Sequence, residues 1–264
     1  MKIQAYVPVF NEADVLPYVL AHLRQQGVDV HIIDGWSTDG GFEYIRTLQE
    51  FCKRGLYGER RVTVERFPAA AASPTQVCTD ILHRIEDLAE TSRADWLFYT
   101  DADEWRRSPV AGETLAEGIE RVDAAGFNAI DFRVYAFFCV DDMWRGDPEK
   151  YFQHYNESDM ICKIPNRKCW KNVGRVALAG GGHEVMFRGM KVAPERFTMK
   201  HYPFRNPEQA RRKLETRLAR RCHDEHRRGW GVHYDEPFPP TFCWNPEDLQ
   251  AWGDPSTPLP SLLL

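Results

Sequence analysis

The chain has 264 residues, of which 43% are hydrophobic and 12% aromatic, so it can bury a full core in one large domain or two joined halves. Its formal net charge of -5 excludes a general nucleic-acid binder, because phosphate backbones require concentrated lysine and arginine. No apolar run approaches the roughly 20 residues of a membrane-spanning helix, and residues 1–10 lack the features of a signal peptide. We therefore expect a cytoplasmic protein with no transmembrane segment, associated with membranes at most peripherally.

The first hundred residues alternate between strand and helix patterns. Segments rich in β-branched and aromatic residues favour strands, whereas apolar residues at helical spacing favour amphipathic helices. The predicted strands are Ile3–Phe10, Val28–Asp34, Arg61–Arg66 and Asp95–Thr100. The apolar stripes of the predicted helices lie within Val15–Leu23, Phe42–Leu48 and Val77–Leu88. This alternation predicts an α/β fold with a mostly parallel sheet covered by helices on both faces.

The second half of the sequence is less regular. It predicts a helix around Leu115–Val122, strands near Phe127–Val140 and Met160–Ile164, and a basic helix that starts at Asn206. Prolines and glycines then dominate, which indicates a tail that wraps the surface. We expect one domain in two halves, a ligand-binding half at 1–110 and an irregular half at 111–205, followed by the helix and tail at 206–264.

Polar side chains follow three of the predicted parallel strands. Asn11 and Glu12 come after the first strand, Asp34 ends the second, and Asp101 and Asp103 come after the fourth. Ligands of open α/β sheets bind beyond the carboxyl ends of the strands. These side chains are therefore expected to converge on one crevice, although Asn11 is also a plausible helix cap and Asp34 a plain turn former.

Asp101 and Asp103 suggest a divalent cation. Carboxylate oxygens suit Mg²⁺ or Mn²⁺, which commonly take one or two protein carboxylates and complete their shell with phosphate and water. A cation placed there can stabilise the negative charge that develops on a diphosphate leaving group.

Three segments together resemble a known family. They are Val7-Pro8-Val9-Phe10-Asn11-Glu12, then Ile33-Asp34-Gly35-Trp36-Ser37-Thr38-Asp39-Gly40, then Thr100-Asp101-Ala102-Asp103-Glu104. In this order they look like the successive motifs of family 2 glycosyltransferases, which have the GT-A fold and a DxD motif. The resemblance covers about the first 105 residues, and a weaker likeness continues at Lys200-His201-Tyr202-Pro203. The second motif departs from the usual pattern, because Gly35 stands where a second acid is common.

The resemblance implies a role for each matching residue. It places Pro8, Asn11 and Glu12 beside the nucleoside and gives Asp34 the contact with the base. It places Asp101 near the ribose or the metal, makes Asp103 a metal ligand and offers His201 as a further ligand. Arg205 and Lys213 are expected to offset the charge of the diphosphate.

The implied activity is a metal-dependent transfer of a sugar from a nucleotide-sugar, a UDP-sugar by preference, to an acceptor hydroxyl with inversion. The acceptor is a glycan, a lipid-linked molecule or a small molecule. Direct displacement needs a general base, for which we select Glu184 after the flexible Gly180–Gly182 segment, with His183 as its neighbour. His183, Asp131, Asp141 and Asp142 are alternatives.

Two other functions compete with this one. A nucleotidyltransferase on a similar sheet requires a loop rich in glycine and arginine after the first strand, and Pro8–Asp14 contains neither. A non-catalytic binding module is the other alternative, favoured by the altered second motif and disfavoured by the intact Asp101 and Asp103.

Overall fold

The computed structural model describes residues 1–73, 78–141, 143–144, 146–156, 164–221, 223, 227–228 and 242–253. Asp142, most of the predicted strand Met160–Ile164 and residues 254–264 lie outside these ranges.

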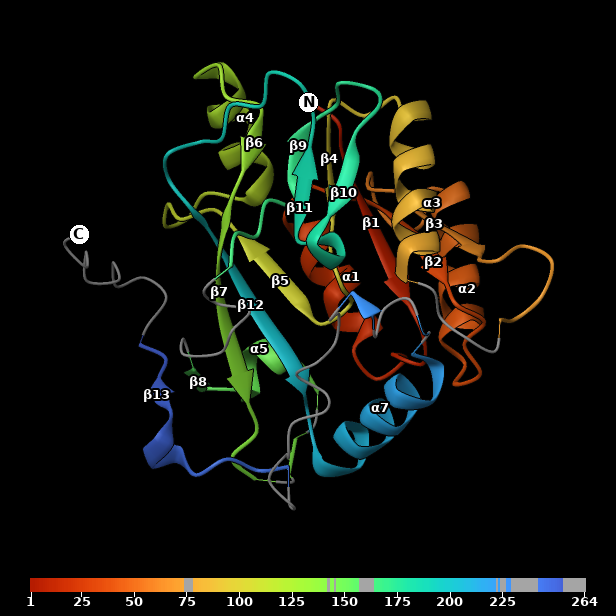
Figure 1. The fold of residues 1–264 in the computed structure, drawn as a ribbon, viewed down its shortest axis with the longest axis vertical. Coiled ribbons are helices and arrows are strands. Elements are labelled where there is room, and N and C mark those ends of the chain that lie inside the picture. Colours follow the sequence, from red (N-terminus) through yellow and green to blue (C-terminus); the bar gives the residue numbers. More distant parts are fainter. Residues whose placement is uncertain are drawn as a thin grey trace.

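A six-stranded sheet forms the centre of the molecule, with the strand order β3-β2-β1-β4-β9-β6 (Figure 1). Its strands are β1 (Ile3–Val9), β2 (Asp29–Asp34), β3 (Val62–Arg66), β4 (Trp96–Tyr99), β6 (Ala129–Ile130) and β9 (Cys169–Lys171). The first four run parallel, and β9 is antiparallel to both β4 and β6. The predicted alternation of strands and helices in the first hundred residues is therefore confirmed.

Helices cover both faces of this sheet, because successive side chains of a strand point to opposite faces. On β4, Trp96 and Phe98 pack into a core with α1 (Leu16–Gln25), α2 (Gly41–Lys53) and α4 (Leu115–Ala124). The alternate residues of β4, Leu97 and Tyr99, pack on the other face with α3 (Cys78–Thr91). The predicted α/β fold class, a mostly parallel sheet flanked by helices, is confirmed.

A second sheet accounts for much of the less regular half, with the strand order β13-β8-β7-β12-β5. Its strands are β5 (Glu104–Arg107), β7 (Phe132–Phe138), β8 (His154–Asn156), β12 (Phe197–Phe204) and β13 (Gln250–Ala251). The segment predicted as one strand, 127–140, divides at Asp131 into β6 and β7, which belong to different sheets. The Asp131 carboxylate accepts a hydrogen bond from the backbone N–H of Asn166 there, at 2.8 Å.

The remaining elements are short, apart from one helix. They are β10 (Ala177–Ala179), β11 (Glu184–Met186), α5 (Pro148–Tyr151), η1 (Gly180–Gly182), η3 (Pro246–Asp248) and α7 (Pro207–Arg220). The predicted start of α7 is confirmed, since the Asn206 side chain accepts from the N–H of Gln209 and Pro207 occupies the first turn. Helix α7 lies at the end of the molecule toward which β1 and β12 point (Figure 1). None of the described helices combines the length and apolarity needed to cross a membrane.

A buried histidine on α1 makes the stability of this core sensitive to pH. His22 is 4% exposed, and its Nε2 lies 3.0 Å from the backbone oxygen of Arg106. Burial lowers the pKa of His22 from 6.5 to about 4, with the nearby Arg107 acting in the same direction and Glu149 opposing it. The folded protein therefore excludes a proton that the unfolded chain binds between these two pH values.

We expect the free energy of unfolding to fall by about 3 kcal/mol through this histidine as the pH drops from 7 to 4. His22→Gln, whose amide can still donate to Arg106, should show a correspondingly smaller loss. Thermal unfolding from pH 7 to pH 4 measures the difference, with the exposed His83→Gln as the control. Identical pH dependence in wild type and His22→Gln would exclude this role for His22.

Candidate active site

The acidic turn, residues 100–103, joins the two sheets and opens into a cavity of about 230 Å³. Residues 100–103 lie between β4 and β5, and the backbone N–H of Glu104 donates to the carbonyl of Asp101 at 3.2 Å. Because this turn is bent rather than extended, Asp101 and Asp103 line the same cavity. The predicted site residues that line it with them are Pro8, Asn11, Glu12, His183, His201 and Lys213.

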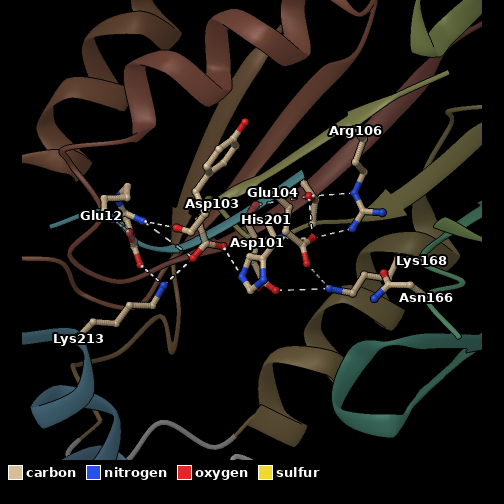
Figure 2. A network of polar contacts seen from close by, with 12 residues as sticks. Glu12, Asp101, Asp103, Glu104, Arg106, Asn166, Lys168, His201 and Lys213 are labelled. Atoms are coloured by element: carbon tan, nitrogen blue, oxygen red, sulfur yellow. Dashed lines mark hydrogen bonds and ion pairs between the residues drawn. The ribbon is translucent and has the colours of Figure 1, made fainter. Parts of the chain in front are cut away.

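Asp103 is surrounded by basic side chains (Figure 2). The Nζ of Lys213 lies 2.5 Å from its Oδ2, the Nε2 of His201 lies 3.6 Å from its Oδ1, and Arg205 is 3.9 Å away. Burial raises the pKa of Asp103, but Lys213, His201 and Arg205 together outweigh burial and leave this pKa below its ordinary value. Asp103 is therefore an ionised carboxylate with 4% of its surface exposed.

Arg205 faces the interior rather than the cavity. It is completely buried, and its guanidinium binds the carboxylates of Glu12 and Asp14, the latter through two contacts of 3.0 Å. Lys213 also lies 3.4 Å from Glu12. The structure thus separates the two predicted diphosphate ligands, since Lys213 lines the cavity and Arg205 supports the loop after β1.

The loops after β1 and β2 are tied together. Asn11 accepts from the N–H of Thr38 at 2.8 Å, and α1 begins only at Leu16, so the helix-cap alternative for Asn11 is wrong. Asp34 is fully buried and accepts from the N–H groups of Trp36 and Ser37 at 3.1 and 3.2 Å. Burial raises the pKa of Asp34, and its hydrogen bonds with Ser37 only partly oppose this. Asp34 is not among the residues that line the cavity.

The two adjacent base candidates have different surroundings. His183 lines the cavity, whereas Glu184, at the start of β11, pairs with Arg167 at 3.7 Å and does not line it. The preceding Gly182 has a φ of 94°, and a Cβ there would lie 2.5 Å from the Tyr99 ring. Only glycine fits this position, which brings His183 close to the acidic turn. Neither Asp131 nor Asp141 lines the cavity.

The donor atoms near the turn suit Mg²⁺ or Mn²⁺. Asp101, Asp103 and His201 present two carboxylates and an imidazole to one cavity, and within the described part of the chain the buried Nδ1 of His201 has no hydrogen-bond partner. In the described ranges, no three His, Cys, Asp or Glu side chains are grouped so that they could hold a metal. The ammonium of Lys213 contacts Asp103 Oδ2. These residues therefore fit a divalent cation in donor type, provided that Lys213 moves away from Asp103.

Several contacts at this site were not predicted from the sequence. Glu104 is buried between Arg106 and Lys168, directly behind the acidic turn. Tyr99 donates a hydrogen bond to Asp101 Oδ1 at 2.9 Å, and α7 adds Arg212 and Arg217 to the cavity wall. The four-residue spacing of Arg217 from Lys213 on one helix was a sequence signal, whereas Lys168 gave none.

Comparison with protein-family models gave no match, and comparison with curated proteins gave none either. Among solved structures, the chain is similar to PcManGT, a mannosyltransferase from Pyrobaculum calidifontis in complex with GDP-Man and Mn²⁺ (TM-score 0.48, 15% identity, 91% of this chain and 66% of that one). It is also similar to TarS from S. aureus, with a TM-score of 0.45, 14% identity and coverage of 83% of this chain and 39% of that one. A UDP-glucose pyrophosphorylase complexed with UDP-glucose gives a TM-score of 0.31 and 9% identity, over 65% of this chain and 69% of that one. The chain thus spans 39% of TarS and 66% of PcManGT. Because the identities are 15% or less and the TM-scores lie below 0.5, a function for this chain must be argued from its own residues.

Proposed function

We propose that this protein is a glycosyltransferase that moves a sugar from a nucleoside-diphosphate sugar to an acceptor hydroxyl, with inversion and with Mg²⁺ or Mn²⁺. The observation that carries the proposal is the meeting of Asp101, Asp103, His201 and Lys213 in one cavity beyond the carboxyl ends of β1 and β4. Oxygen ligands beside a cationic side chain suit a metal-bound diphosphate.

The roles of the residues follow from their positions. Asp101, Asp103 and His201 would hold the divalent cation, which when bound supplies the Lewis acidity that stabilises a diphosphate leaving group. The Lys213 ammonium already contacts Asp103, so a small movement of this side chain would bring it to the phosphate oxygens that the cation binds. Pro8, Asn11 and Glu12 form the wall beside the nucleoside. Asp34 and Arg205 shape this wall from behind through the loops after β2 and β1.

In this proposal residues 1–110 bind the donor, residues 111–205 bind the acceptor, and the helix of 206–264 closes the donor site. His183, at the cavity wall, accepts the proton of the acceptor hydroxyl as the sugar is transferred. Glu184 is the second candidate for this proton transfer.

The proposal predicts that nucleoside diphosphates bind only when a divalent cation is present. Without the cation, a diphosphate would face the carboxylates of Asp101 and Asp103 directly, while Lys213 stays paired with Asp103. Calorimetric titration of UDP, GDP and dTDP with Mn²⁺, with Mg²⁺ and with EDTA measures this, and AMP serves as a control for general nucleotide affinity. Equal binding in EDTA, or binding of none of the three in any condition, would contradict the proposed function.

A further inference from the structure

A buried network of charges lies directly behind the acidic turn (Figure 2). The side chains of Glu104, Arg106 and Lys168 are at most 1% exposed. Glu104 Oε2 lies 2.6 Å from Arg106 Nη2, and Glu104 Oε1 lies 2.9 Å from Lys168 Nζ. Burial raises the pKa of Glu104, but Lys168 and Arg106 overcome this and hold the pKa far below its ordinary value. One carboxylate and two basic side chains are therefore buried in contact with one another.

The network continues into the turn itself. The backbone N–H of Asp101 donates to Glu104 Oε2 at 3.1 Å, and Lys168 Nζ lies 3.4 Å from Asp101 Oδ2. The second oxygen, Asp101 Oδ1, accepts from the Tyr99 hydroxyl at 2.9 Å. Both carboxylate oxygens of Asp101 are thus held, although 43% of this side chain is exposed.

The charges show why Lys168 is more than a partner of Glu104. Glu104 and Arg106 already form a neutral pair, so the buried ammonium of Lys168 is an additional positive charge. Its two ion pairs are with Glu104 and Asp101, so Asp101 supplies the balancing negative charge. A buried ammonium is costly unless it is paired, which ties the position of the Asp101 carboxylate to Lys168.

Lys168 reaches the turn from the other half of the chain. It immediately precedes β9, and its carbonyl accepts from the N–H of Tyr99 at 3.0 Å, which fixes its backbone beside the end of β4. Its ammonium also lies 4.6 Å from the centre of the Tyr99 ring. Tyr99 and Lys168 therefore contact each other, and each of them contacts one oxygen of the Asp101 carboxylate.

We propose that Lys168 is a positioning residue that fixes the Asp101 carboxylate in the orientation needed to bind a metal-bound diphosphate, with Glu104 as its anchor. This inference rests on the proposed function. Residues that orient a metal ligand from behind typically change metal affinity about 10- to 100-fold when they are lost. Lys168→Met keeps the length of the side chain and removes its charge, so we expect such a loss in the affinity for Mn²⁺ with a nucleoside diphosphate.

The test is calorimetric titration of Mn²⁺ with whichever of UDP, GDP and dTDP the wild-type protein binds, together with thermal unfolding. The matched control is Lys171→Met in the adjoining strand β9, and the side chain of Lys171 is 47% exposed and pairs with Asp123 at 2.7 Å. A merely structural Lys168 would lower the unfolding temperature and leave the dissociation constant of the folded protein unchanged. A double-mutant cycle with Asp101→Asn adds a second criterion, since Lys168→Met should cause little further loss of affinity in that background.

Lys168→Arg covers the case in which Lys168→Met fails to fold. It retains the buried positive charge, but its planar head differs in shape from an ammonium, so we expect a folded protein with several-fold weaker binding. An affinity within twofold of wild type in a folded Lys168 variant would overturn the inference while leaving the proposed function standing. Failure of the wild-type protein to bind would instead remove the proposed function on which the inference rests.

Discussion

Asp103→Asn is expected to reduce sugar transfer by about 100- to 1,000-fold or more, which is typical of losing one electrostatic contact to a developing negative charge. Asp103 is the most buried carboxylate of the cavity wall, and it faces both His201 and Lys213. The asparagine keeps the shape and removes the charge that would hold the cation. The initial rate of donor turnover, measured with saturating Mn²⁺, is the appropriate readout.

The same substitution should leave the fold intact. Glu12, Asp14 and Asp103 face two permanent cations, Arg205 and Lys213, so removing one acid leaves two acids for two bases. No buried charge is then left without a partner, and the usual cost of breaking a buried pair does not apply.

Asp14→Asn is the matched control for Asp103→Asn. It removes a carboxylate from the same cluster, but Asp14 does not line the cavity. We expect unfolding temperatures close to one another in the two variants and near-normal turnover only in Asp14→Asn. Retained turnover in Asp103→Asn would remove Asp103 from the metal site.

Much of the donor side of this site was predictable from the sequence. Each strand of the first hundred residues ends within two residues of its predicted end, because strand patterns and turn residues are local signals. The parallel topology then brings the loop after β1 and the turn after β4 to one edge of the sheet. The capped start of α7 was equally local, and it places Lys213 on the turn of the helix that faces Asp103.

The orientation of individual side chains was not predictable in the same way. Arg205 turns inward because it binds Glu12 and Asp14 on the loop after β1, and Asp34 pairs with Arg66 of β3 in addition to its local hydrogen bonds. Lys168 lies 64 residues from Glu104, and nothing in the local sequence marks this pairing. Such contacts depend on the packing of the two sheets, which a sequence pattern does not specify.

His183→Gln is expected to slow transfer by about 100- to 10,000-fold, the usual contribution of a general base. The reason lies in the cavity, which His183 lines with Asp101 and Asp103. The adjacent Glu184 starts β11 and directs its carboxylate toward Arg167, so Glu184→Gln should retain turnover within a few-fold of wild type. These neighbouring substitutions form a matched pair, measured by steady-state rates at saturating donor.

The neighbour of His183 indicates which of its nitrogens accepts the proton. Asn166 Nδ2 lies 3.4 Å from His183 Nδ1, and the buried Asn166 Oδ1 has no hydrogen-bond partner among the residues that the structure describes. Rotating this amide by half a turn lets Oδ1 accept from Nδ1–H, which satisfies the buried oxygen and leaves Nε2 as the basic nitrogen. The backbone of Asn166 is fixed by its hydrogen bond to Asp131.

Measuring both the rate and the binding affinity of His183→Gln distinguishes a base from a residue that only shapes the cavity. If His183 is the base, His183→Gln should lower the rate of transfer while the affinity for Mn²⁺ with nucleoside diphosphate stays within a few-fold of wild type. A His183 that only shapes the cavity would instead weaken the binding of Mn²⁺ with nucleoside diphosphate in His183→Gln. Near-normal turnover in His183→Gln together with a large loss in Glu184→Gln would assign the base to Glu184, and this would require β11 to turn its first residue toward the cavity.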